Sequence, residues 1–113
     1  MIKRTTRLRR LLSDPRILVA PGAYDGTGAR LVQALDFQAI YLSGFATSAS
    51  LLGEPDVGYL TMTQMADRAA AIADAVELPL IADADTGYGN PLNVRRAVHA
   101  YEKAGAAAMH IED

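Results

Sequence analysis

Three acidic residues lie at the ends of two successive apolar runs of the sequence, in a pattern that could hold a metal ion. Asp83 and Asp85 follow the run at residues 80–82, and Glu112 follows the run at residues 107–111. Side chains two residues apart on a strand point to the same side, so the carboxylates of Asp83 and Asp85 are predicted to converge. No Lys or Arg occurs in either segment. Three converging carboxylates would repel one another unless a cation lay between them.

Oxygen ligands of this kind predict Mg²⁺, with Mn²⁺ as the alternative, and disfavour zinc. Because Mg²⁺ usually keeps several waters, we expect one of the three acids to bind it directly and the others to act through water. The competing interpretation is that each acid caps a helix or lies in a solvated loop. That interpretation is reasonable for one acid alone, but a shared metal site is favoured for all three together.

Other strand ends carry residues that could contact an anion. Ser43, Gly44 and Phe45 combine a hydroxyl with adjacent backbone N–H groups, which fits either an anion site or a plain turn. Gly87 and Gly89 form a glycine-rich loop before a predicted helix and could approach a phosphate. Their spacing matches neither the dinucleotide motif nor the P-loop, so the phosphate interpretation is weak.

Two further residues are candidates for proton transfer or ligation. His110 lies two residues before Glu112 and is predicted to point the same way; the competing interpretation is a hydrogen-bonded interior histidine. Asp56 lies in a long connection over residues 45–60, which is rich in Ser, Thr and Gly. Connections of that length are often functional, so Asp56 could cover the site, although an aspartate that closes a turn fits equally well.

The elements that must position these residues alternate regularly. Strands are predicted at residues 17–20, 39–42, 80–82 and 107–111, and stretches of helical period lie between them. Thr61 and Gln64 form a capping box at the start of one helix, and Asn90 caps another that has Pro91 at its first position and Gly105 at its end. The predicted buried helical faces are Leu31, Ala34 and Leu35; then Met62, Met65, Ala69, Ile72, Ala73 and Val76; then Val94, Ala97, Val98 and Tyr101.

Alternating strands and helices predict an α/β fold with parallel pairing and right-handed crossovers. An open doubly wound sheet and half of an eight-fold βα barrel both fit. Polar residues follow three successive strands at one rim, as in barrel active sites, so we favour the N-terminal half of a (β/α)8 TIM barrel. A complete barrel needs about 200 residues or more, so the 113 residues are expected to belong to a longer protein. Residues 1–16 are expected to form a basic N-terminal helix, and residues 17–113 the first four βα units.

Composition narrows the classes of function. The sequence is 50% hydrophobic and 21% charged with a formal charge of −2, which offers no general field for nucleic acid. Five of the eleven basic residues precede residue 11, so the remainder has six basic against thirteen acidic residues. No apolar run approaches the roughly 18 residues of a membrane span. The absence of cysteine excludes disulfides and thiolate catalysis within these residues and is compatible with the expected cytoplasmic location.

Together, several segments resemble the isocitrate lyase and phosphoenolpyruvate mutase superfamily. They are residues 17–25, 41–44, 53–58, 83–90 and 110–113, and the resemblance extends from about Ser13 to the end of the sequence. The Asp-Ala-Asp-Thr-Gly-Tyr-Gly-Asn segment, followed one βα unit later by Ile-Glu-Asp, is specific for the superfamily but not for one member.

The resemblance implies a βα barrel that assembles into dimers or tetramers and binds a small carboxylate substrate. It implies that Asp83 binds the metal and that Asp85 and Glu112 contact metal-bound water. Substrate contacts are implied for Ser43, Gly44, Phe45 and Asp83, and catalytic roles for Asp56, near the reacting centre, and Tyr41, beside the substrate.

The implied reaction is Mg²⁺-dependent cleavage of a carbon–carbon bond in a 2-hydroxy or 2-oxo carboxylate, with release of pyruvate, as in methylisocitrate lyases. The alternatives are oxaloacetate decarboxylation, a phosphonomutase reaction, and a non-catalytic half-barrel that works by association. The loop that carries the cysteine acid in lyases of this superfamily is expected after residue 113, so the 113 residues alone are expected to be inactive.

Overall fold

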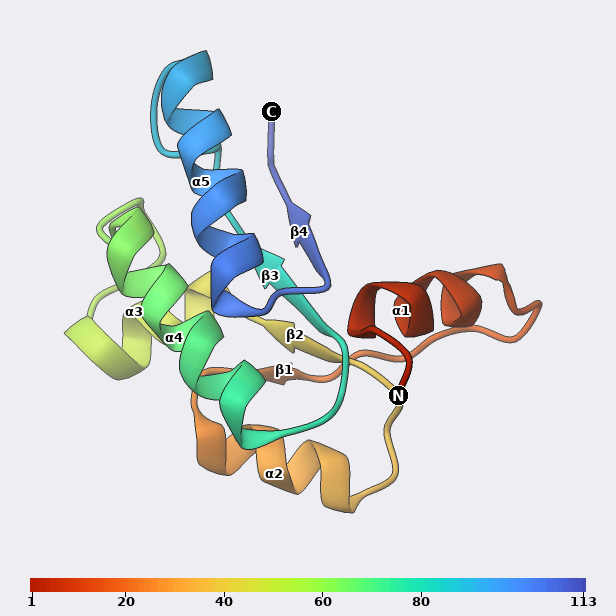
Figure 1. The fold of residues 1–113 in the computed structure, drawn as a ribbon. Helices are drawn as coiled ribbons and strands as arrows, with labels where there is room; N and C mark the ends of the chain where they lie inside the picture. The colour runs from red at the N-terminus through yellow and green to blue at the C-terminus, as the bar shows by residue number, and fades with distance from the viewer.

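The computed structural model describes all residues from 1 to 113 and contains five helices and four short strands (Figure 1). In chain order these elements are α1 (Arg4–Ser13), β1 (Gly22–Ala23), α2 (Gly26–Ala34), β2 (Ile40–Leu42), α3 (Gly44–Leu52), α4 (Met62–Ala75), β3 (Leu80–Asp83), α5 (Pro91–Ala104) and β4 (Ala108–His110). None of the helices has both the length and the apolar character needed to cross a membrane.

The four strands form one parallel sheet in the order β1-β2-β3-β4. Each strand therefore pairs with its neighbour in the chain. A doubly wound sheet reverses its strand order at a switch point, whereas strands of a βα barrel follow one another in sequence. The observed order thus favours the barrel over the open sheet, and it brings the carboxyl ends of all four strands to one rim.

Helices α2, α4 and α5 pack on one face of this sheet, with α4 between the other two (Figure 1). Their small inner residues allow close approach to the strands: Ala29 and Ala69 are fully buried beside the strand residues Ile40 and Leu80 in one continuous core. Helix α1 lies near the amino ends of the strands, away from the rim. Arg4 donates to the Val76 carbonyl at 2.6 Å and Arg7 donates to the Gln38 side chain at 3.1 Å.

Local sequence signals set the ends of the two longest helices as predicted. Thr61 and Gln64 form the reciprocal capping box of α4. Asn90 caps α5, and Gly105 ends it with a left-handed backbone at φ 95°. The predicted inner face of α4 is also confirmed, since Met65, Ala69, Ile72, Ala73 and Val76 are buried.

Two predictions were wrong, namely the position of the first strand and the buried face of α2. The first strand is not at residues 17–20 but at β1, because β2 begins only at Ile40 and its register pairs Gly22 with Tyr41. Residues 17–20 therefore have no strand opposite them, and Ile17 is 90% exposed. The inner face of α2 consists of Ala29 and Val32, whereas Leu31 and Leu35 are about 60% exposed.

The long connection after β2 is also more ordered than predicted. Its first part is helix α3, which begins at an N-cap that Ser43 provides. The loop proper is confined to residues 53–61, between α3 and α4. The crossover from β2 to β3 therefore contains two helices, and the loop between them reaches the rim of the sheet.

The edges of this sheet generate a prediction about association. Strands β1 and β4 each have one unpaired edge, and apolar side chains such as Ile17, Leu31 and Leu92 are more than half exposed. Unpaired edges and exposed apolar surface favour association between chains. We therefore expect the isolated 113-residue chain to sediment as oligomers or aggregates. A monodisperse monomer of 12 kDa that unfolds cooperatively would contradict this expectation.

Candidate metal and substrate site

The carboxyl ends of β3 and β4 bring three potential metal ligands together. Asp83, the last residue of β3, pairs in register with His110, the last residue of β4. Asp83, His110 and Glu112 each offer a ligand atom, and these atoms all lie within 4.8 Å of one another. The predicted convergence of Asp83 and Glu112 is therefore observed, and His110 joins them as the third residue of the group.

Backbone groups fix both oxygens of the half-buried Asp83 side chain. The N–H of Gly44, at the start of α3, donates to Oδ2 at 3.1 Å. The N–H of Asp85 donates to Oδ1 at 2.9 Å. A carboxylate oxygen has two lone pairs, so each oxygen can still accept a further donor or bind a cation. These hydrogen bonds orient the carboxylate without using its full capacity as a ligand.

Asp85 reaches the site by a different geometry from the predicted one. It lies beyond the last residue of β3 and has a left-handed backbone at φ 48°, so strand alternation does not direct its side chain. Its carbonyl accepts the N–H of Glu112 at 2.8 Å, which ties the end of β4 to the loop after β3. Asp85 lies beside Asp83 in the cavity but outside the group of three ligand atoms.

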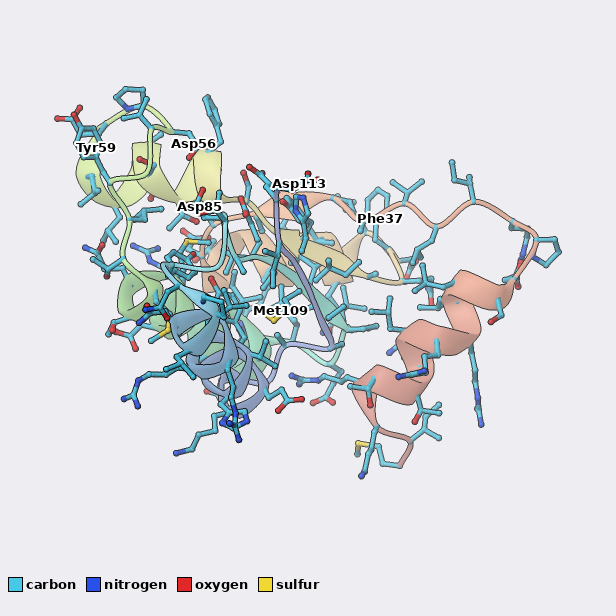
Figure 2. The ribbon with its side chains drawn as sticks, turned by 90° about the horizontal axis from the view of Figure 1, so that it is seen from above. Phe37, Asp56, Tyr59, Asp85, Met109 and Asp113 are labelled. Atoms are coloured by element: carbon cyan, nitrogen blue, oxygen red, sulfur yellow. The ribbon has the colours of Figure 1, made fainter.

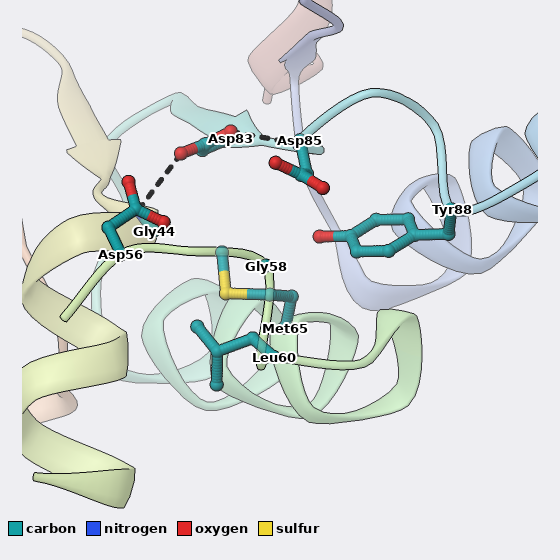
Figure 3. Close-up of a pocket in the computed structure, with 8 residues that line it drawn as sticks. All are labelled: Gly44, Asp56, Gly58, Leu60, Met65, Asp83, Asp85 and Tyr88. Carbon is teal, nitrogen blue, oxygen red and sulfur yellow. Dashed lines mark hydrogen bonds between the residues drawn. The ribbon is translucent and has the colours of Figure 1, made fainter. Parts of the chain in front are cut away.

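A small pocket, open to solvent, lies next to this group (Figure 3). The acids Asp56, Asp83 and Asp85 all face it, from two different loops and one strand end. The other lining residues are Gly44, Gly58, Leu60, Met65 and Tyr88. Figure 2, which views the molecule from above, shows Asp56 and Asp85 at the same side of the fold. The structure therefore brings the loop residue Asp56 to the predicted acidic site.

A buried hydroxyl holds the loop that carries Asp56. Ser48, in α3, is 1% exposed, and its Oγ contacts the carbonyls of Glu54 at 3.0 Å and Pro55 at 3.1 Å. The N–H of Glu54 in turn donates to the Ser48 carbonyl at 3.4 Å. These contacts fix the loop immediately before Asp56.

Tyr41 and His110 form a hydrogen-bonded pair between the ends of β2 and β4. The Tyr41 hydroxyl lies 3.2 Å from Nδ1 of His110, whose side chain is exposed. Burial, assisted by the charges of Asp83, Glu112 and Asp56, raises the pKa of Tyr41. The Tyr41 hydroxyl therefore stays protonated at neutral pH and can donate a hydrogen bond.

The segment predicted to bind an anion forms the start of α3. The Ser43 side chain accepts the Ala46 N–H at 3.1 Å, and the Gly44 N–H is bonded to Asp83. Only Gly44 of this segment lines the cavity, and the Phe45 side chain is 66% exposed. Ser43 is thus a helix cap at the edge of the site, and part of the capacity to bind an anion is already used within the chain.

The sequence-based reasoning missed the role of Tyr88. This residue has a left-handed backbone at φ 65°, and its ring borders the cavity. Burial, opposed in part by the hydrogen bond to Tyr101 and assisted by the nearby aspartates, raises the pKa of Tyr88 to about 12. The glycines at 87 and 89 were the available signal, because two flexible positions around an aromatic residue indicate that its placement matters.

The residues present fit a divalent cation. The donor set contains two carboxylates and one imidazole within 4.8 Å, a third carboxylate from Asp85 lies beside it, and no Lys or Arg lines the cavity. Carboxylate oxygens, which form two of the three members of the group, favour Mg²⁺ and Mn²⁺. A divalent cation would stabilise these clustered carboxylates, because no basic side chain lines the cavity to balance their charge.

Comparisons with known proteins agree with this arrangement. The family model described as phosphoenolpyruvate phosphomutase matches residues 8–113. The chain belongs to this family. It is 53% identical over 107 residues to 2,3-dimethylmalate lyase of Eubacterium barkeri, and this aligned region covers 95% of this chain and 37% of the relative. It is 46% identical over 107 residues to 2-methylisocitrate lyase of Bacillus subtilis, and this aligned region covers 95% of this chain and 35% of that relative.

Solved structures support the fold in the same way. A phosphonopyruvate hydrolase in complex with oxalate and Mg²⁺ aligns with a TM-score of 0.94 at 40% identity, over 99% of this chain and 39% of the hydrolase chain. The predicted α/β barrel class is thereby confirmed. The chain spans between about a third and two fifths of the length of the family members described above. Further relatives are named oxaloacetate decarboxylase and carboxyvinyl-carboxyphosphonate phosphorylmutase.

The close approach of α3 to Asp83 generates a prediction. A Cβ atom at position 44 would collide with Oδ2 of Asp83, so Gly44→Ala must displace the carboxylate. We expect this substitution in the full-length protein to weaken Mn²⁺ binding by about 10-fold or more, as measured by electron paramagnetic resonance, since residues that orient a metal ligand commonly contribute 10- to 100-fold to affinity.

Gly26→Ala is the matched control for this substitution. A Cβ atom there would lie 3.5 Å from the Ala75 side chain, which is an ordinary contact, and no atom of Asp83 lies within 4 Å of it. Equal Mn²⁺ affinity in the two variants would show that Gly44 does not set the position of Asp83.

Proposed function

We propose that this chain forms part of a divalent-metal-dependent lyase. The enzyme would cleave a carbon–carbon bond in a 2-hydroxy or 2-oxo carboxylate and release pyruvate, in the manner of 2-methylisocitrate or 2,3-dimethylmalate cleavage. The observation that supports this proposal most directly is the grouping of Asp83, His110 and Glu112 beside an acidic cavity, in a chain of the phosphoenolpyruvate phosphomutase family.

The proposed cation would be Mg²⁺, with Mn²⁺ as a substitute. Asp83, Glu112 and His110 would hold it, and Asp85 would contact its waters. When bound, the cation would supply positive charge that stabilises the negative charge developing on substrate oxygens during bond cleavage. A relative with oxalate and Mg²⁺ in its structure supports this pairing of a small carboxylate with a divalent ion.

The residues around the cation would orient the substrate. The start of α3 carries the positive end of a helix dipole, and in this proposal the Ser43 hydroxyl, Gly44 and the Phe45 N–H face the substrate carboxylate. Tyr41 would donate a hydrogen bond to the substrate from its protonated hydroxyl. Asp56 would lie over the reacting carbon from the loop between α3 and α4. These roles use the position of each residue at the rim of the sheet.

Three further features of the proposed enzyme come from the sequence alone. They are a dimeric or tetrameric assembly, a cytoplasmic location, and a basic N-terminal segment over residues 1–16 that precedes the βα units. The proposed substrate is a small molecule, with neither nucleic acid nor membrane as a partner.

Sister reactions of the same superfamily are the second candidates. Relatives 41% and 49% identical to this chain are named oxaloacetate decarboxylase and carboxyvinyl-carboxyphosphonate phosphorylmutase. The acidic group and the start of α3 would serve these reactions equally well, because a cation held beside a substrate carboxylate would stabilise developing negative charge in each of them. Substrate preference therefore has to be measured.

We expect the full-length protein to release pyruvate from 2-methylisocitrate or 2,3-dimethylmalate in the presence of Mg²⁺. Each acid should be supplied separately, with oxaloacetate as the third substrate, and pyruvate followed by a coupled dehydrogenase assay. Release of pyruvate from oxaloacetate alone would overturn the lyase proposal in favour of decarboxylation.

Asp83→Ala in the full-length protein should abolish the Mg²⁺-dependent activity while the circular dichroism spectrum stays that of the folded protein. Removal of a ligand from the metal group accounts for the expected loss. Asp74→Ala is the matched control, since Asp74 is exposed in the last turn of α4 and lies outside the cavity. Activity retained in Asp83→Ala would remove this residue from the metal site.

A further inference from the structure

Tyr101 is a buried residue of α5 that contacts the acidic site without lining it. Its side chain is 1% exposed, and its hydroxyl donates to the backbone carbonyl of Asp83 at 2.8 Å. The same hydroxyl lies 2.9 Å from the hydroxyl of Tyr88, and the two rings are stacked with centroids 6.4 Å apart. Tyr101 therefore connects the outer helix layer to both the predicted metal ligand and the wall of the cavity.

The direction of these hydrogen bonds follows from counting protons. A tyrosine hydroxyl has one proton, and a carbonyl can only accept, so the proton of Tyr101 is committed to Asp83. The proton shared between the two hydroxyls must then come from Tyr88. The chain of donation runs from Tyr88 to Tyr101 to the Asp83 carbonyl, and the Tyr88 oxygen can offer only lone pairs to the cavity.

The peptide that Tyr101 contacts is the one where β3 ends and the strained loop begins. The other end of the same peptide, the Ala84 N–H, donates to the His110 carbonyl at 2.9 Å, and the N–H of the next peptide, that of Asp85, donates to the Asp83 side chain at 2.9 Å. Asp85 and Tyr88 then adopt left-handed backbones, which are uncommon for residues other than glycine and persist only where surrounding contacts hold them. Tyr101 supplies such a contact from outside the loop.

We propose that Tyr101 is a positioning residue for this site: its hydroxyl fixes the Asp83–Ala84 peptide and directs the Tyr88 proton away from the cavity. It acts through Asp83 and Tyr88 and does not itself touch the substrate. The proposal rests on the proposed function where it concerns metal affinity, and on geometry alone where it concerns the order of the loop.

The test compares Tyr101→Phe and Tyr88→Phe in the full-length protein. Tyr101→Phe keeps the ring in the core but removes both hydrogen bonds, whereas Tyr88→Phe removes only the bond between the hydroxyls. We expect Tyr101→Phe to weaken Mn²⁺ binding by about 10-fold, the lower end of what residues behind a metal ligand contribute, and Tyr88→Phe to weaken it less. Tyr59→Phe, on an exposed ring of the α3–α4 loop, should leave Mn²⁺ affinity unchanged.

Amide hydrogen exchange provides a readout that does not need the metal. In Tyr101→Phe, we expect the amide of Asp85 to exchange about 10-fold faster, while the amides of the α4 core around Ile72 keep their protection. A purely structural role would instead raise exchange across the whole fold. Unchanged exchange at Asp85 would overturn the proposal.

The two proposals can fail separately. Faster exchange at Asp85 in Tyr101→Phe, combined with no Mn²⁺ binding in the wild-type protein, would keep the positioning role and reject the metal site. Normal Mn²⁺ affinity in Tyr101→Phe, with binding lost in Asp83→Ala, would keep the metal site and reject the positioning role.

Discussion

Repulsion between carboxylates at the rim of the sheet is the constraint on which the rest of this structure depends. Two unit charges 4.8 Å apart, the limit that encloses the ligand atoms of Asp83 and Glu112, repel by roughly 3 kcal/mol at an effective dielectric constant of about 20, and by less where solvent screens an exposed group such as Glu112. A hydrogen bond to a charged group contributes about 1.5 to 3 kcal/mol. The N–H groups of Gly44 and Asp85 can therefore stabilise the Asp83 carboxylate in place, but Asp56 and Asp85 add further negative charge around the same cavity. A divalent cation is the simplest group that compensates all of them.

The fold is arranged to present these charges at one place. Parallel strands in sequential order bring each following loop to the same rim, so residues 44, 56, 83 and 112 become neighbours although they are far apart in the chain. Two helices contribute contacts at the rim. Helix α3 supplies the Gly44 N–H and the Ser48 hydroxyl that holds the loop before Asp56, and Tyr101 of α5 reaches the Asp83 carbonyl. The core beneath the site and the orientation of its acids are thus parts of one packing arrangement.

The sequence predicted most of this arrangement where a local signal was sufficient. Capping residues defined α4 and α5, and apolar runs indicated β2, β3 and β4 to within one or two residues. It failed where the outcome depended on a partner. The first strand was predicted too early in the sequence, because β2 leaves residues 17–20 without a pairing partner. The buried face of α2 was predicted wrongly, because the exposed residues Leu31 and Leu35 have the same spacing as a buried pair. Asp85 lies at the predicted edge of the sheet, but through a left-handed backbone that the alternation of side chains along a strand does not predict. The hydrogen bond of the Tyr101 hydroxyl was not predicted, because Tyr101 was assigned to the apolar face of its helix.

The central claim is that a divalent cation occupies the space between Asp83, His110 and Glu112. A crystal of the full-length protein soaked in Mn²⁺ and measured at the manganese absorption edge tests it most directly. The account predicts one anomalous peak at bonding distance from the Asp83 carboxylate, with Glu112 or His110 as a further ligand. Density that shows these side chains turned into solvent, with no anomalous peak between them, would contradict it.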